Sequence, residues 1–246
     1  MATKDQFSFL GGEPKPENST LRPMDIQLKQ ESASPKESIP SGQTGLPWDT
    51  RGASFDSFTS TFLLVVSSPR RAFRLMSPGG GILRPMHFAL VGMCVGGIGL
   101  FLLNLAATVL LNPSASTANS QASVQLGLTG LILIIGIPIS MLGLLLQAMV
   151  LHYCLRLTGS GKRGFEATYR VIAYATGSNW VLVAIPFIGV VIQPIWQVCE
   201  IILGLAVVHE SSVGRVVFAV LLPIFMVILL GVLLVALTAL IVSVSP

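Results

Sequence analysis

The stretch Met86–Leu111 reads MHFALVGMCVGGIGLFLLNLAATVLL and contains no Asp, Glu, Lys or Arg. The charge-free sequence continues to Leu155, and another charge-free stretch covers Val216–Val244. A third apolar stretch, Val171–Val208, holds one charge, Glu200. About 20 apolar residues are enough for a helix to cross the hydrocarbon core of a bilayer. These stretches therefore predict an all-α integral membrane protein.

The composition and charge agree with a membrane location. Hydrophobic residues make up 52% of the 246 residues and charged residues 11%, whereas soluble domains carry about 25% charged residues. Residues 1–50 hold five Lys or Arg and seven Asp or Glu, and residues 51–246 hold ten and four. Because the cations lie beside apolar stretches, membrane orientation explains the excess positive charge. The sequence therefore predicts no nucleic-acid partner.

Turn and charge signals divide the membrane domain, residues 86–246, into a predicted five-span helical bundle. The spans cover residues 86–111, 126–151, 171–189, 194–208 and 216–242, and a tight turn with Pro186, Gly189 and Pro194 joins the third to the fourth. Loops with cations alternate with loops that have none. By the positive-inside rule this pattern predicts a multi-pass protein with its N-terminus in the cytoplasm and its C-terminus outside.

The sequence before the first span has two parts. Residues 1–45 are rich in Pro, Ser, Glu, Lys and Gly, which predicts a disordered cytoplasmic tail. Residues 46–85 form an amphipathic, basic juxtamembrane segment. Its apolar residues at helical spacing are Phe55, Phe58, Phe62, Val65 and Val66, and its arginines include Arg70, Arg71 and Arg74. Two interpretations stay open: a helix in the membrane interface with these arginines at lipid headgroups, or a helix packed on the bundle whose arginines only set topology.

Glu200 is the candidate intramembrane polar site, together with Gln193 and Gln197. The three residues share one face of a helix. An ionisable group inside a span is costly and usually faces the bundle interior, so one interpretation is an ion or proton site. The other is a hydrogen-bonded carboxyl that only joins helices. We favour the second, because the membrane stretches offer no second acid and no obvious cation partner.

Small and polar residues within the spans predict helix contacts. Gly92 and Gly96 form a Gly-x-x-x-Gly pattern, which allows close approach of two helices within the chain or between two copies. Asn179 is an isolated polar group, for which we expect an interhelical hydrogen bond.

Signals for catalysis or metal binding are sparse. The sequence has no HExxH motif and no nucleophile elbow. Cys94, Cys154 and Cys199 lack metal-type spacing. His152 and His209 each follow a predicted span, so both should lie near the cytoplasmic interface. We predict no catalytic residue, no cofactor and no metal site.

A family resemblance is visible over residues 47–233. The residues that carry it are Pro47-Trp48-Asp49, Ser68-Pro69, Phe73, Arg163-Gly164-Phe165, Arg170, Tyr174, Ile185-Pro186-Phe187-Ile188-Gly189, Trp196, Gly204-Leu205, His209 and Gly214-Arg215. In these residues the chain resembles the Yip-domain family, the Ypt/Rab-interacting membrane proteins, in its bacterial form. The resemblance implies a five-span bundle with a cytoplasmic N-terminus. It implies no catalytic residues.

The sequence and the resemblance together predict a non-enzymatic membrane protein that organises membrane or recruits partners. The expected partners are the lipid bilayer and proteins bound by the tail, or a second copy bound through the spans. A bacterial member would lie in the plasma membrane, and a eukaryotic one in the endoplasmic reticulum or Golgi. The alternative function is a small ion or solute transporter that uses Glu200 in a bundle cavity.

Overall fold

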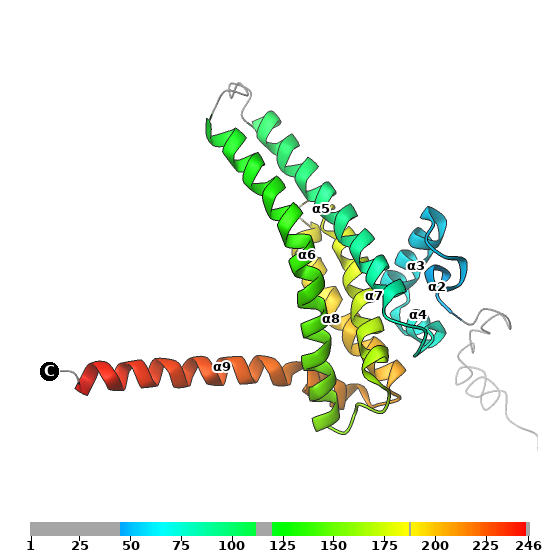
Figure 1. Cartoon of the computed structure of the whole chain (residues 1–246), viewed down its shortest axis with the longest axis vertical. Coiled ribbons are helices and arrows are strands. Elements are labelled where there is room, and N and C mark those ends of the chain that lie inside the picture. Colours follow the sequence, from blue (N-terminus) through cyan, green and yellow to red (C-terminus); the bar gives the residue numbers. More distant parts are fainter. Residues whose placement is uncertain (1–44, 112–119, 187, 245–246) are drawn as a thin grey trace, which may run out of the picture. The chain divides into compact units, whose positions relative to one another are not determined.

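The computed structural model describes residues 45–111, 120–186 and 188–244, and every regular element in those residues is a helix (Figure 1). The helices are α2 (Pro47–Arg51), α3 (Phe55–Ser67), α4 (Pro69–Leu75), α5 (Leu83–Leu111), α6 (Ser120–Leu157), α7 (Phe165–Leu182), α8 (Ile188–Val208) and α9 (Val213–Val244). The predicted all-α class is confirmed. The tail predicted over residues 1–45 lies, apart from Gly45, outside the described residues.

Four of the described helices are long and apolar enough to cross a membrane. Their apolar parts are Leu83–Leu110 in α5, Leu126–Leu157 in α6, Gly189–Val208 in α8 and Val213–Thr238 in α9. Each reaches the roughly 20 residues that a bilayer requires. The chain is therefore an integral, multi-pass membrane protein whose apolar side chains contact lipid.

The fifth span is not confirmed. The sequence placed a span at residues 171–189, whereas α7 covers Phe165–Leu182 and includes Glu166 and Arg170. This helix is too polar to be a candidate membrane span by its composition. It packs against α5, α6 and α8, so its polar side chains lie inside the protein, where Tyr174 and Asn179 donate hydrogen bonds, and the helix does not depend on an apolar exterior.

The predicted turn between the third and fourth spans is wrong in part. Helix α8 already begins at Ile188, so Gly189 and Pro194 lie within it, and only Pro186 falls between α7 and α8. A proline inside a membrane helix costs one backbone hydrogen bond, which neighbouring groups can compensate. Gly189 has a packing role, because a Cβ there would lie 2.0 Å from the Leu182 carbonyl oxygen.

Two glycines of α5 let its backbone touch that of α7. A Cβ at Gly92 would lie 2.0 Å from the carbonyl oxygen of Gly177, and a Cβ at Gly96 would lie 2.0 Å from that of Trp180. Real Cβ atoms essentially never come so close, so any other residue would push the helices apart. The predicted role of the Gly-x-x-x-Gly pattern in close packing is confirmed, and the contact lies within the chain.

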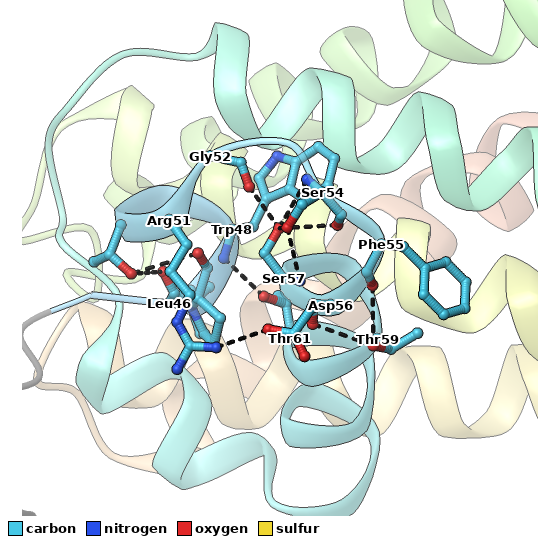
Figure 2. A network of polar contacts seen from close by, with 12 residues as sticks. Leu46, Trp48, Arg51, Gly52, Ser54, Phe55, Asp56, Ser57, Thr59 and Thr61 are labelled. Atoms are coloured by element: carbon cyan, nitrogen blue, oxygen red, sulfur yellow. Dashed lines mark hydrogen bonds and ion pairs between the residues drawn. The ribbon is translucent and has the colours of Figure 1, made fainter.

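Helices α2, α3 and α4 form a unit that we call the N-terminal platform, residues 46–76. Ser54 caps α3, since its Oγ accepts a hydrogen bond from the Ser57 backbone N–H at 3.2 Å. The Trp48 backbone N–H donates to Thr61 Oγ1 at 3.0 Å and so joins α2 to α3, as Figure 2 shows. The Trp48 indole donates to the Arg84 carbonyl oxygen at 2.9 Å. This second bond holds the platform to the start of α5.

The juxtamembrane segment forms two helices, since α3 ends at Ser67 and Pro69 begins α4. The apolar face of α3 turns toward the bundle, where Phe58 and Val65 are buried, whereas Phe55 is 84% exposed. On α4, Phe73 is buried and lies against Gly204 of α8. The interpretation of a segment packed on the bundle is therefore correct for these buried side chains.

Candidate functional site

The predicted polar residues of α8 meet α7 in the interior. Asn179 Nδ2 of α7 donates to Glu200 Oε2 at 2.6 Å, and both side chains are fully buried. Asn179 Nδ2 also donates to the Ala175 carbonyl oxygen at 2.9 Å. The expectation that Asn179 makes an interhelical hydrogen bond is confirmed.

Gln193 and Gln197 continue the same line of polar groups along α8. Gln193 Nε2 donates to Gln197 Oε1 at 2.6 Å, and Gln197 Nε2 donates to Thr176 Oγ1 of α7 at 3.0 Å. The structure thus brings the three predicted site residues onto one helix face, turned toward α7. Hydrogen bonds of this kind hold helices together where lipid offers no polar partner.

The geometry of Glu200 suits a helix contact better than an ion path. The side chain has no exposed surface. A cavity of about 340 Å³ between α5 and α6 is lined by apolar residues, among them Phe101, Leu133 and Ile137, and Glu200 does not line it. Glu200 Oε1 is nevertheless buried without a hydrogen-bond partner among the described residues, and this unpaired oxygen is the feature that an ion or proton would use.

A second polar centre joins the platform to α7. Arg170 Nη2 donates to Asp49 Oδ2 at 2.5 Å, and the two side chains are only 2% and 11% exposed. The Tyr174 hydroxyl donates to Asp49 Oδ1 at 2.6 Å, and Arg170 Nη1 donates to the Gly81 carbonyl oxygen at 2.9 Å. Such charge-assisted bonds are among the stronger ones in proteins. We call this group the Asp49–Arg170 centre.

Sequence reasoning from charge and spacing missed the Asp49–Arg170 centre. The two residues are 121 positions apart, and no local pattern links them. The signal that included them was the family resemblance, which rested in part on Asp49, Arg170 and Tyr174. In the structure Arg170 lies in the second turn of α7.

A third polar group forms a chain between the ends of α6, α7 and α8. The Arg163 backbone N–H donates to His209 Nδ1 at 3.1 Å, so the ring proton is on Nε2. Thr168 Oγ1 lies 3.0 Å from His209 Nε2 and 2.9 Å from His152 Nδ1. Burial, followed by the charges of His152 and Arg163, lowers the pKa of His209 to about 4. His209 is therefore neutral near pH 7 and acts as a structural link.

The three arginines predicted to contact lipid headgroups lie on α4. Arg70 and Arg74 are exposed, and Arg71 is half-buried. Among the described residues no group of three or more His, Cys, Asp or Glu side chains is arranged to hold a metal ion.

The fold and these sites define a class: a multi-pass helical membrane protein whose interior includes polar contacts between helices. A family model for the Yip1 domain matches residues 63–236. The chain belongs to the Yip1 domain family, as its sequence resemblance implied. Neither the curated proteins nor the solved structures contain a match to the chain.

Proposed function

We propose that this Yip1 domain protein is a non-enzymatic membrane protein that recruits partners through its N-terminal residues. The Asp49–Arg170 centre carries the proposal. A buried ion pair between the platform and α7 fixes the chain at residue 49 to the bundle. We expect partners that bind the N-terminal residues to be held at the membrane through this attachment.

The proposed orientation has the N-terminus in the cytoplasm and the C-terminus outside. Arg84 and Arg215 lie in the first turns of α5 and α9, and Arg163 lies just before α7, which supports a cytoplasmic side at those three helix starts. In this proposal α7 makes the fifth crossing together with α5, α6, α8 and α9. Residues 1–45 are the tail, 46–85 the juxtamembrane part and 86–246 the membrane domain. The bacterial form of the resemblance favours the plasma membrane as the location.

The arginines of α4 are proposed to contact lipid headgroups. Arg70 and Arg74 are exposed on a helix whose opposite side, with Ala72 and Phe73, is buried. Arg71 lies beside them, half-buried. Each cation near an anionic membrane surface contributes about 1 kcal/mol to association.

Deletion of residues 1–44 tests recruitment while keeping Asp49 in place. We would purify the full chain and residues 45–246 from the same membranes and quantify the copurifying proteins by mass spectrometry. The proposal expects a defined set of proteins to be lost from the shortened chain, with unchanged thermal stability. Retention of the same set by both chains would contradict recruitment through the tail.

The alternative function, a small ion or solute transporter, is favoured by the unpaired oxygen of Glu200. Reconstituted liposomes would report proton and cation flux from the wild type and from Glu200→Gln. Flux that disappears in the variant would establish this alternative. Absence of flux from both leaves Glu200 as a contact between α7 and α8.

A further inference from the structure

A small cavity with both charged and apolar walls lies where the platform meets the end of a membrane-spanning helix. Its volume is about 200 Å³, and three separate segments line it. Helix α4 contributes Phe73 and Arg74, the connection between α6 and α7 contributes Arg163, and the end of α8 contributes Val207 and Val208. Glu210, just after α8, completes the wall.

Two guanidinium groups are available to an anion in this cavity. Arg74 is exposed and pairs with no acidic side chain among the described residues. Arg163 Nη2 donates to Glu210 Oε1 at 2.5 Å, and the two side chains are 46% and 66% exposed. An exposed pair of this kind contributes little to stability, so an incoming anion can replace the carboxylate at small cost.

The position of the cavity relates it to the membrane. Val207 and Val208 are the last residues of the apolar part of α8, so the cavity lies at the level where that helix leaves the hydrocarbon core. Phe73 is 2% exposed and gives the cavity an apolar floor beside its two arginines. A soluble anion such as free phosphate has no apolar group to pack against Phe73. A lipid has a charged headgroup and apolar carbon next to it, so it can contact both the arginines and Phe73.

We propose that this cavity binds the phosphate of an anionic lipid headgroup, with Arg74 and Arg163 as hydrogen-bond donors and Glu210 as an internal competitor. Guanidinium groups bind phosphate through paired N–H donors. Glu210 is charged at neutral pH, because the hydrogen bond and charge of Arg163 keep its pKa below the ordinary value. The proposal deepens the headgroup contact proposed for α4 and rests on the same placement of α4 at the membrane.

The test titrates the purified full chain in neutral detergent with phosphatidic acid and, separately, with phosphatidylcholine, and counts bound lipid by native mass spectrometry. Arg74→Gln and Arg163→Gln should each weaken phosphatidic acid binding by about fivefold, the equivalent of one headgroup cation. The Arg163 backbone bond to His209 is kept in that variant. Arg215→Gln, an exposed cation outside this cavity, should leave binding unchanged.

Glu210→Gln should change the affinity for phosphatidic acid in the opposite direction to the arginine variants. A misfolded protein would lose binding, so it could not produce this gain. Removal of the competing carboxylate should strengthen phosphatidic acid binding by about fivefold. The matched control is Asp56→Asn, because Asp56 forms an equally exposed pair with Arg51 away from the cavity. Equal effects of Glu210→Gln and Asp56→Asn, or of the pocket arginines and Arg215, would overturn the proposal in favour of general charge attraction.

A second arm separates the lipid from a free phosphate. Glycerol 3-phosphate is added as competitor at concentrations above that of phosphatidic acid. Weak competition is expected, since the floor at Phe73 contributes only to the lipid. Equal affinity for the two compounds would overturn the lipid assignment. Neither arm depends on residues 1–44, so failure here is distinguishable from failure of the recruitment experiment.

Discussion

Helices α7 and α9 show opposite relations between hydrophobicity and burial. Helix α9 has the highest mean hydropathy of the candidate spans, 3.2, yet every side chain described from Ile224 to Thr238 is exposed on the protein surface. Helix α7 contains Arg170 and Asn179, yet all of Ala167–Asn179 is buried. In water the apolar helix would form the core. In a bilayer the solvent is itself apolar, so polar and small groups gather inside.

The two helices depend on different surroundings. Helix α9 needs lipid, and beyond Val216 and Ala219, which are buried, it depends little on the rest of the chain. Helix α7 needs particular partners on α5, α8 and the platform. Substitutions on α7 and at its contacts should therefore lower the free energy of unfolding, whereas the same changes elsewhere should not.

The largest effect is expected at the Asp49–Arg170 centre. Asp49→Ala leaves the Arg170 guanidinium buried without its carboxylate, and we expect a loss of about 3–5 kcal/mol in the free energy of unfolding. Unfolding in mixed micelles, followed by circular dichroism, measures the loss. Asp56→Ala, which removes an exposed ion pair, should cost under about 1 kcal/mol. Similar costs for the two variants would show that burial of the pair is unimportant.

The next effect concerns the contact of α5 with α7. Gly92→Ala places a Cβ where the Gly177 carbonyl oxygen already lies, and we expect destabilisation of about 3 kcal/mol because two backbones must separate. Gly231→Ala is the control, since a Cβ on this residue of α9 would meet no atom within 4 Å. The same micelle titration compares them. A neutral Gly92→Ala would contradict the close contact.

A smaller effect is expected from the bond between Asn179 and Glu200. Asn179→Ala removes one donor inside the membrane, where such bonds contribute about 1 kcal/mol. A double-mutant cycle with Glu200→Ala isolates the interaction from other consequences of each change. Zero coupling between the two positions would mean that the polar line does not hold α7 to α8. Gln147→Ala, an exposed site on α6, should be neutral.

The smallest effect is a dependence on pH through His209. Its pKa of about 4 lies below the value of about 6.5 for an unfolded chain, so the unfolded state binds more protons between those values. Stability should therefore fall as the pH drops from about 6.5 toward 4, by on the order of 1 kcal/mol at pH 5. Unfolding titrations at pH 7.5 and 5 measure the fall. His209→Asn should reduce the pH dependence, and an unchanged slope would assign it to other groups.

The sequence predicted the lipid-facing helices well and the buried helix poorly. Long apolar stretches, charge-free except for Glu200, identify α5, α6, α8 and α9 because lipid demands apolar side chains over a whole span. The start of α7 was missed, since Glu166 and Arg170 suggested a loop. In the structure Glu166 Oε1 accepts a hydrogen bond from the Gly81 backbone N–H at 2.5 Å, and Arg170 is also paired. Those partners come from distant segments, which local reading cannot supply.

The candidate site was predicted as a set of residues but not as a set of contacts. Helical spacing correctly placed Gln193, Gln197 and Glu200 on one face. It said nothing of Thr176 and Asn179 as their partners, because the pairing depends on the register between α7 and α8. That register is set in part by glycine contacts such as Gly189 against Leu182, which spacing alone does not reveal.

The distance along the chain between Asp49 and Arg170 also has a consequence for synthesis. The two residues are 121 positions apart, and a ribosome adding about 5–20 residues per second needs roughly 6–24 s to make that length. During this interval α5 and α6 leave the ribosome while α7, which packs against α3, does not yet exist. The platform is thus made well before the helix that supplies its ion-pair partner, and a nascent chain stalled before α7 carries Asp49 without its arginine.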